Sequence, residues 1–454
     1  MTPPLWTSTA IAAATGGSAS REFAVTGVAF DSREVGPGDL FVALAGEQSD
    51  GHRFLDQALA QGAAGALVQC DTPHPHVRVA DTTAALDALA RAARARTAAT
   101  VIGVTGSVGK TSAKEALAAA LERGHPGRVH RSVKSYNNHT GVPLSLARMP
   151  ADSRFAVLEM GMNHAGEIAA LTRLVRPHIA LVTAVAAVHI EHFADEDGIA
   201  DAKAEIFAGL EPHGTAIVPF DSSHRDRLAD AARGHGARVV TFGTGEGADV
   251  RALEVMRTPT GGSFVSVRLS AHELSFTLAQ PGAHHVSNAL GVLAAVDAAG
   301  GDLGLAGLAL AELGGLPGRG ARFVTAGGVL VLDESYNANP TSMRATLAVL
   351  GEEPGRHVAV LGAMGELGDD APRYHAELAQ PVLDAQVEAM VLVGEAMAPL
   401  ATALEQKVNV VHVPDAATAV AALPALLHDG DTVLVKGSNA VGLARVVAAL
   451  RGMG

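Results

Sequence analysis

The chain contains 454 residues, of which 48% are hydrophobic and 18% are charged, and its formal net charge at pH 7 is −13. This length favours about two to four domains over a single core, and the composition excludes a largely disordered chain. The negative charge argues against a nucleic-acid partner and against electrostatic attachment to an anionic membrane.

Three features of the sequence bear on localisation. Cys70 is the only cysteine, so no intramolecular disulfide can form. The N-terminal segment has no basic region before its short apolar run, and no stretch of about 18 uninterrupted apolar residues occurs elsewhere. We therefore expect a cytoplasmic protein with no membrane insertion.

A small α/β module is expected at residues 1–96. Its strand-like runs alternate with turns rich in Gly and Asp, and they span 25–30, 40–45 and 66–69. An alanine-rich helix is expected from Thr83 to about Arg94, and residues 97–100 form the predicted hinge to the next domain.

A larger domain with a parallel sheet is expected at residues 97–316. Continuous apolar runs alternate there with helical stretches, which is typical of a parallel sheet covered on both faces. The predicted strands span 101–105, 155–160, 179–185, 216–219 and 239–242. Residues 248–280 instead alternate apolar and polar side chains, so we expect an appended β-hairpin, followed by a helix at 285–299.

The alternating pattern restarts after Leu316-Pro317-Gly318 and predicts a third domain at residues 317–454. Its strands are expected at 329–333, 357–361, 389–393, 408–413 and 432–435. Helices separate them, which indicates a Rossmann-like, doubly wound domain. The predicted fold class is therefore α/β with three domains.

A phosphate-binding loop is predicted immediately after the strand at 101–105. It reads Gly106-Ser107-Val108-Gly109-Lys110-Thr111 and leads into a helix. Glycines let backbone amides turn inward, the helix N-terminus adds partial positive charge, and the lysine and hydroxyl contact phosphates and Mg²⁺. Val104 stands where the strict motif has its first glycine. We predict binding of ATP or GTP with magnesium, whereas the reaction class stays open.

Metal-binding side chains are predicted at the ends of two strands of the same sheet. Glu159 lies at the end of the run 155–160, and His189 follows the run 179–185. Ligands bind at the carboxyl ends of parallel strands, where the phosphate loop also emerges. A capping or surface role is the alternative for each residue.

Lys203, in the helical stretch DAKAEIF, is a further candidate. Only six of the 34 basic side chains are lysines, so a lysine marks a place where arginine does not serve equally well. A buried lysine can lose its proton and react with CO₂ to give a carbamate that binds metal, whereas arginine cannot. A surface lysine is the alternative.

Nine motifs, in order along nearly the whole chain, resemble those of the Mur ligases. They are TGSVGKT (105–111), YNNHTGVP (136–143), EMGMNHAGEI (159–168), HIEHF with AKAEIF (189–207), SNALGVLAA (287–295), LPGR (316–319), DESYNANPTSM (333–343), LGAMGELG (361–368) and LVKGS (434–438). Several of them are similar to the branch of the family that adds D-alanyl-D-alanine. The DNPR-type signature of the branch that adds a diamino acid is absent.

The resemblance implies a set of functional residues. Those implied in catalysis are Lys110, Asn138, His189 and Lys203. Those implied in ATP binding are Thr105, Gly106, Ser107, Gly109, Lys110, Thr111, Ser112, Asn288 at the adenine, Arg319, and Asp333 or Glu334 near the ribose. Those implied in holding two Mg²⁺ ions are Thr111, Glu159, His189 and carbamylated Lys203. Those implied in substrate binding are Ser32, Arg33 and His52 for the UDP-sugar, and Tyr336, Asn337 and Asn339 for the dipeptide.

The resemblance also implies an activity. A monomeric enzyme would join D-alanyl-D-alanine to UDP-N-acetylmuramoyl-tripeptide through an acyl phosphate, giving the pentapeptide, ADP and phosphate in peptidoglycan synthesis. Residues 1–96 would bind the UDP-sugar, 97–316 ATP, and 317–454 the incoming dipeptide. The sequence departs from the family pattern at Glu334, Ala283 and Asn439, where a second aspartate, a basic residue and an arginine are common.

Two alternatives remain open. A related ligase adding another amino acid, or a polyglutamate-adding enzyme acting on folate, would share most motifs, although the N-terminal module argues against folate. A P-loop ATPase without ligase chemistry would share only the phosphate loop, and it leaves the third domain and Lys203 unexplained.

Overall fold

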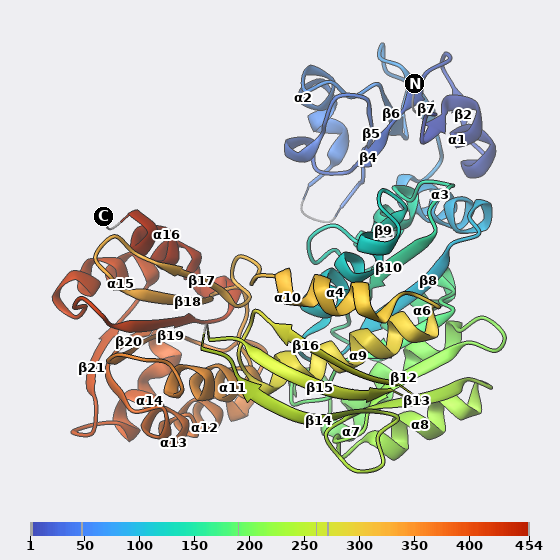
Figure 1. Cartoon of the computed structure of the whole chain (residues 1–454). Helices are drawn as coiled ribbons and strands as arrows, with labels where there is room; N and C mark the ends of the chain where they lie inside the picture. The colour runs from blue at the N-terminus through green and yellow to red at the C-terminus, as the bar shows by residue number, and fades with distance from the viewer. Residues whose placement is uncertain (1–2, 47–48, 189, 260, 270–271, 453–454) are drawn as a thin grey trace.

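The computed structural model describes residues 3–46, 49–188, 190–259, 261–269 and 272–452. Figure 1 shows three sheet-centred regions, with the blue N-terminal region above the green and yellow central region and the orange and red C-terminal region at its side. The predicted α/β class is confirmed. Among the described residues, no helix is both long and apolar enough to cross a bilayer.

The N-terminal region is built on a five-stranded sheet of order β2-β7-β6-β5-β4, in which only β2 is antiparallel. Its strands are β2 (Ser18–Ala19), β4 (Gly27–Ala29), β5 (Asp39–Val42), β6 (Gly65–Val68) and β7 (His76–Arg78), and β1 (Trp6–Thr7) pairs separately with β3 (Ala24–Val25). Its helices are α1 (Ser8–Thr15), α2 (Leu55–Ala60) and α3 (Thr82–Arg96), with 3₁₀ turns η1 (Ser32–Glu34) and η2 (Gly51–Phe54). The run predicted as one strand at 25–30 is divided between β3 and β4.

Helix α3 connects the first region to the second. Asp81 caps its N-terminus by accepting from the backbone N–H groups of Thr83 and Ala84. Its buried side recurs at helical spacing and packs on the N-terminal sheet and on α5 (Gly141–Ala147). Trp6 Nε1 donates to Ala147 O at 2.8 Å, which attaches the two regions further.

The central region is built on a nine-stranded sheet of order β16-β15-β14-β13-β12-β11-β8-β10-β9. Its parallel strands are β8 (Thr100–Thr105), β9 (Val129–Arg131), β10 (Phe155–Glu159), β11 (Ile179–Val182), β12 (Thr215–Pro219) and β13 (Arg238–Gly243). One face packs on α4 (Lys110–Gly124), α9 (Ala283–Ala298) and α10 (Leu303–Glu312). The other packs on α5, α6 (Glu167–Val175), α7 (Glu196–Ala204), α8 (Arg225–Gly234) and η4 (Glu205–Gly209), while η3 spans Ile190–His192.

The hairpin predicted at 248–280 is a three-stranded extension of this sheet. β14 (Val250–Arg257) pairs in parallel with β13 and antiparallel with β15 (Ser263–Leu269), which pairs antiparallel with β16 (His272–Leu278). The β15–β16 hairpin is confirmed, but β14 was not predicted as a separate strand. Its apolar side chains at Leu253, Val255 and Met256 are exposed, so they do not follow the alternation that marks a half-buried strand.

The C-terminal region is built on a six-stranded sheet of order β17-β18-β22-β19-β20-β21, parallel except at β17. Its strands are β17 (Ala321–Val324), β18 (Leu330–Glu334), β19 (His357–Gly362), β20 (Val387–Val393), β21 (Asn409–Val413) and β22 (Thr432–Lys436). One face packs on α11 (Pro340–Gly351), α12 (Ala371–Ala376), α13 (Ala379–Asp384) and α14 (Ala398–Ala403), and the other on α15 (Ala416–Ala422) and α16 (Ala444–Gly452). Short 3₁₀ turns complete it at η5 (Gly368–Asp370), η6 (Glu395–Met397), η7 (Leu423–Ala425) and η8 (Asn439–Val441). All five predicted strands are present.

A buried ion-pair cluster joins the central extension to the C-terminal sheet. Glu353 follows α11, and its side chain is 1% exposed. It accepts from Arg257 of β14 at 2.8 Å and from Arg322 of β17 at 2.6 and 3.1 Å. Because the three side chains come from both regions, they fix how the two sheets meet.

Candidate active site

The predicted phosphate loop joins the C-terminal end of β8 to the N-terminus of α4. Gly106 and Gly109 have positive φ angles of 145° and 86°, and a Cβ on them would collide with Thr183 and Asn288 respectively. Lys110 lies in the first turn of α4, where its Nζ donates to Gly106 O at 2.7 Å. Backbone amides, a helix N-terminus and an ammonium group therefore surround one small space, an arrangement that binds phosphates.

Hydroxyl groups hold this loop in shape. Ser107 Oγ donates to Ala186 O and accepts from Ala186 N, both at 3.0 Å. Thr183 Oγ1 donates to Val108 O at 2.6 Å. The buried Thr105 Oγ1 has no hydrogen-bond partner within the described part of the chain.

A carboxylate lies directly beside the loop. Glu159 is the last residue of β10 and is 1% exposed. Its two oxygens accept from Thr111 Oγ1 at 2.9 Å and from Asn137 Nδ2 at 2.7 Å. Ser135 Oγ lies 3.2 Å from the same Thr111 hydroxyl. Carboxylate and hydroxyl oxygens are the donors that Mg²⁺ prefers, and the burial of Glu159 excludes the surface alternative.

A buried lysine that the sequence reasoning did not select supports this group. Lys114 is fully buried in α4, and its Nζ donates to Ser132 O at 2.9 Å and to Lys134 O at 2.5 Å. The same ammonium lies 3.0 Å from Glu115 and 3.9 Å from Glu159. The available signal was its position one helical turn after Lys110, in a chain with few lysines.

Lys203 lies in the last turn of α7 and is fully buried. Its Nζ has no hydrogen-bond partner among the residues that the structure describes. Burial lowers its pKa well below the usual value, and the nearby positive charge of Lys110 acts in the same direction. The surface alternative for Lys203 is therefore excluded, and a neutral amine is favoured. His189 lies outside the described residues.

A cavity of about 650 Å³ extends from the phosphate loop to the C-terminal sheet. It brings together most of the residues predicted for nucleotide, metal and dipeptide binding. Those lining it are Ser107, Gly109, Lys110, Thr111, Ser112, Asn138, Glu159, Asn288, Arg319, Tyr336, Asn337 and Asn339. Those predicted but absent from its described lining are Thr105, Gly106, Lys203, Asp333, Ser32, Arg33 and His52.

Three cations face this cavity from two regions. Lys110 comes from the central region, and Arg319 and Lys436 come from the C-terminal region. Burial lowers the pKa of both Lys110 and Lys436. Arg319 lies 3.9 Å over the Tyr336 ring and donates to Ser135 Oγ at 3.3 Å. Converging, partly desolvated cations favour a polyanionic ligand.

The two acidic residues at the end of β18 have different surroundings. Asp333 is buried and accepts from Gly318 N at 2.9 Å and from Ser335 Oγ at 2.6 Å, so its carboxylate holds the chain beside Arg319. Glu334 lines the cavity instead, 3.8 Å from Lys436, and burial raises its pKa. Of the two residues considered for the ribose, the structure places only Glu334 at the cavity.

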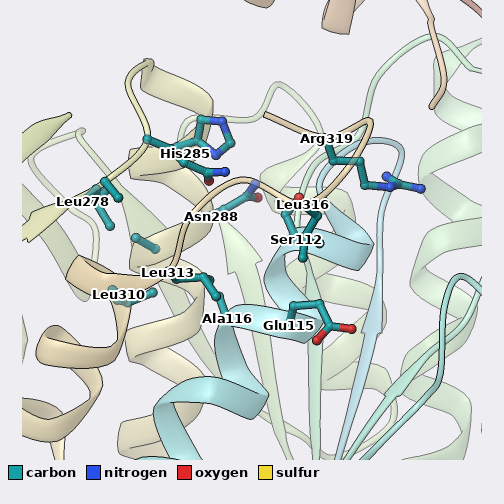
Figure 2. A pocket seen from close by; sticks show the side chains of 14 residues that line it. Ser112, Glu115, Ala116, Leu278, His285, Asn288, Leu310, Leu313, Leu316 and Arg319 are labelled. Atoms are coloured by element: carbon teal, nitrogen blue, oxygen red, sulfur yellow. The ribbon is translucent and has the colours of Figure 1, made fainter. Parts of the chain in front are cut away.

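An apolar pocket adjoins the cavity and shares with it Ser112, His285, Asn288 and Arg319. Figure 2 shows Asn288 with Leu278, Leu310 and Leu313 on one side and Leu316 and Arg319 on the other. The apolar walls are Leu278, Ala289, Leu310, Leu313 and Leu316. An amide that both donates and accepts, set among apolar walls, suits a flat heterocyclic base.

The residues predicted for the UDP-sugar lie in the N-terminal region. Ser32 Oγ donates to Gln57 Oε1 at 3.1 Å. Arg33 is 80% exposed and pairs with Asp31 at 2.6 Å. His52 accepts from Gln69 N at 2.9 Å.

A further link, which the sequence reasoning missed, runs from this region toward the phosphate loop. Glu34 ends η1, and both its oxygens accept from Tyr136 Oη at 2.9 Å. Lys134 also pairs with Glu34. Since Lys134 and Tyr136 flank Ser135, the link leads directly to the group around Thr111.

Comparison with known families gives three matches along the chain. The models described as Mur ligase family, catalytic domain; Mur ligase middle domain; and Mur ligase, glutamate ligase domain match residues 24–127, 104–296 and 318–439.

Individual proteins match over nearly their full length. The UDP-N-acetylmuramoyl-tripeptide--D-alanyl-D-alanine ligase from Escherichia coli is 36% identical to this chain, and the alignment covers 93% of each of the two chains. The ligase of the same name from Bacillus subtilis is 34% identical, and the alignment covers 93% of this chain and 92% of that one. A crystal structure of MurF from Acinetobacter baumannii is 32% identical, with a TM-score of 0.87 over 99% of both chains. A MurF ligase from Thermotoga maritima, solved in complex with ADP, is 27% identical with a TM-score of 0.80, and 94% of this chain is covered with 98% of that one.

Proposed function

The chain belongs to the Mur ligase family, and on that premise we propose that it is the ATP-dependent ligase that joins D-alanyl-D-alanine to UDP-N-acetylmuramoyl-tripeptide. The product is the UDP-linked pentapeptide, a precursor of peptidoglycan. The observation that carries this proposal is the match to ligases of that name over more than nine tenths of the chain. The cationic cavity between the central and C-terminal sheets supports it.

We infer that the ATP phosphates bind at the loop between β8 and α4. Lys110 and the loop amides would neutralise the phosphate charge, and Arg319 would approach from the C-terminal region. The pocket around Asn288 suits the adenine, since its leucines pack on the base and the amide pairs with the base edge. Glu334 is the better-placed candidate for the ribose, because Asp333 is already occupied by backbone and hydroxyl donors.

We propose that Thr111 and Glu159 hold Mg²⁺, together with His189. The two oxygen-bearing side chains lie 2.9 Å apart beside the loop, which fits a hard cation. When bound, Mg²⁺ supplies charge neutralisation for the transferred phosphoryl group. Asn137 and Lys114 orient Glu159 and the segment that faces it.

Lys203 fits the predicted carbamate. Its buried Nζ has no hydrogen-bond partner among the described residues, and its depressed pKa favours the neutral amine that attacks CO₂ and loses a proton. The carbamate would convert this side chain into an anion that supports a second metal ion. A ¹³C carbamate resonance in protein equilibrated with ¹³C-bicarbonate, absent from Lys203→Ala, would identify it without an activity assay.

The reaction proposed has two steps. The terminal carboxylate of the tripeptide attacks the γ-phosphorus of ATP, which forms an acyl phosphate and releases ADP. The amine of D-alanyl-D-alanine then attacks the acyl carbon, forming the amide, releasing phosphate and losing a proton. Asn138 is the side chain proposed beside the acyl group, since it lines the cavity next to the loop.

The UDP-linked tripeptide and the dipeptide would bind to different regions of the chain. Residues 1–96 are proposed to bind the UDP-sugar through Ser32, Arg33 and His52. Residues 97–316 would bind ATP, and 317–454 the dipeptide, through Tyr336, Asn337 and Asn339 at the cavity. Asn339 Oδ1 also caps α11 by accepting from Ser342 N at 2.9 Å, which fixes this part of the lining. A monomer in the cytoplasm, where ATP is available, is the proposed working state.

The test is phosphate release from ATP by the purified chain with UDP-linked tripeptide and one amine at a time. Stimulation by D-alanyl-D-alanine alone, with a product heavier by that dipeptide, is expected. Stimulation by a single amino acid would assign the chain to another ligase of the family. Hydrolysis that no amine changes, with no amide formed, would contradict ligase chemistry.

A further inference from the structure

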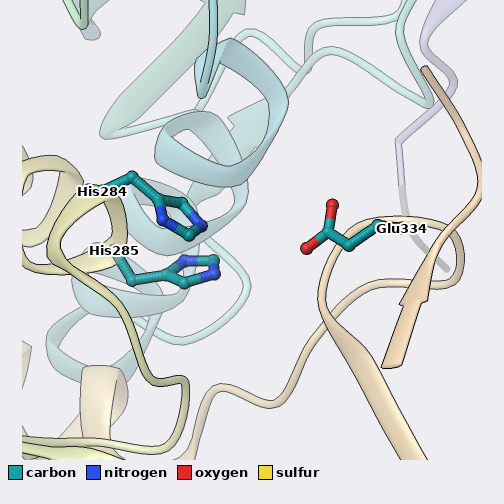
Figure 3. A group of neighbouring side chains, drawn as sticks. All are labelled: His284, His285 and Glu334. Carbon is teal, nitrogen blue, oxygen red and sulfur yellow. The ribbon is translucent and has the colours of Figure 1, made fainter. Parts of the chain in front are cut away.

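Two imidazoles and a carboxylate lie near one another between the N-terminus of α9 and the end of β18 (Figure 3). His284 and His285 lie in the first turn of α9, and Glu334 is the last residue of β18. One possible ligand atom of each residue lies within 4.8 Å of the others, and all three residues are half-buried. The three side chains therefore converge from two regions of the fold.

The two imidazoles carry nitrogen atoms that the surrounding protein does not use. Their rings contact each other, with centroids 4.1 Å apart and planes inclined at 43°. In the described ranges, neither ring takes part in a hydrogen bond. The chain turns sharply before them, since Gly282 has a φ of 107° and a Cβ there would lie 3.0 Å from the His284 ring. The absence of a side chain on Gly282 therefore leaves room for the His284 ring at the N-terminus of α9.

The donor types select the class of metal. Mg²⁺ prefers oxygen ligands, whereas two imidazoles with one carboxylate suit Zn²⁺ and neighbouring transition metals. Three protein ligands leave one coordination position for water or a phosphate oxygen. Lys436 lies 3.8 Å from Glu334 but is also held by Asn337 O at 2.9 Å.

We propose that His284, His285 and Glu334 form a zinc-class metal site that ties α9 to β18. A metal bound there would hold the central and C-terminal regions in the arrangement described. The three residues also line the large cavity, so the ion would occupy space beside the nucleotide and compete with it. This last consequence rests on the proposed function, whereas binding of the metal does not.

Zinc binding is measured by calorimetry on the full-length protein after treatment with EDTA and removal of the chelator, without nucleotide or peptide. We expect one equivalent of Zn²⁺, and visible absorption bands when Co²⁺ replaces it. His284→Gln and Glu334→Gln should each raise the Kd for Zn²⁺ at least about tenfold. His235→Gln is the matched control, because this exposed histidine follows α8, which packs on the face of the central sheet opposite to α9.

Failure to bind one equivalent, or equal zinc affinity in the wild type and both cavity variants, would overturn the proposal. Circular dichroism and unfolding midpoints measured in EDTA establish that the variants are folded. Loss of zinc binding in only one folded cavity variant would also overturn the three-ligand site. Because none of these measurements uses ATP or an amine acceptor, the ligase assay tests the proposed function separately.

Discussion

Replacing Lys114 by Met is the sharpest test of how the site is held together. Methionine keeps the length and the apolar stem of the side chain but removes its ammonium group. The carbonyl oxygens of Ser132 and Lys134 then lose the Nζ donor, and Glu115 and Glu159 lose a buried positive neighbour. Water cannot replace the ammonium easily, because Lys114 is fully buried.

The size of the effect follows from these contacts. A buried acceptor left without a donor costs about 1–3 kcal/mol, and removing one partner of a buried ion pair costs about 3–5 kcal/mol. The two effects overlap, because one ammonium makes all the contacts, so we expect the free energy of unfolding to fall by about 3–5 kcal/mol. The loop carrying Ser135 and Asn137 should also loosen around Glu159. One weakened hydrogen bond to a charged group corresponds to roughly tenfold weaker binding of Mg²⁺-ADP.

Two assays separate these effects. Urea unfolding followed by circular dichroism gives stability, and calorimetry with ADP at several Mg²⁺ concentrations gives nucleotide affinity. Lys407→Met is the control: the ammonium group of this exposed lysine donates to Ala403 O of α14 at 3.2 Å, and its loss should change stability by less than about 0.5 kcal/mol. A Lys114→Met protein as stable as the control, with unchanged Mg²⁺-ADP affinity, would refute the reasoning.

Three further predictions concern other buried groups. Lys203→Ala should lower the ligase rate by about 10–100-fold, and bicarbonate should not restore it; full activity would remove the carbamate from the mechanism. Burial lowers the pKa of His130 to about 4, so as pH falls from about 6.5 to 4 the unfolded chain binds the proton first. The wild type should lose up to about 3 kcal/mol more stability over that range than His130→Gln, measured by urea unfolding; parallel pH profiles would contradict this. Glu353→Ala removes the buried carboxylate shared by Arg257 and Arg322, so that Arg257 keeps only its exposed partner Glu352, and it should cost about 3–5 kcal/mol. The exposed neighbour Glu352→Ala should cost less than about 1 kcal/mol in the same unfolding assay, and equal losses would refute the burial argument.

Elements with a local signal were predictable. The strand, loop and helix around Lys110 are adjacent in the chain, and the glycines, the lysine and the hydroxyl are each required by local backbone geometry or phosphate chemistry. The buried parallel strands of the central and C-terminal sheets were predictable for the same reason, because both faces are covered and their sequences are continuously apolar. Short strands and edge strands were not predicted: β9 has three residues, and β17 is an edge strand of the C-terminal sheet.

The family pattern located the site, but it did not distinguish neighbouring residues within it. Asp333 and Glu334 differ by one position in β18, and alternation along the strand sends one carboxylate into the turn and the other to the cavity. Only the position of the strand relative to Gly318 and Lys436 decides which is which.

The sequence alone determined the phosphate loop, the α/β class and the family, because these depend on contiguous residues and on the order of motifs. The tertiary structure decided which side chains are buried and paired. Lys114 meets carbonyl oxygens 18 and 20 residues away, Glu34 meets Tyr136 102 residues away, and Glu334 faces His284 across two regions. No local pattern encodes such pairs, because a side chain's charge, desolvation and partners depend on which surfaces the folded sheets bring together.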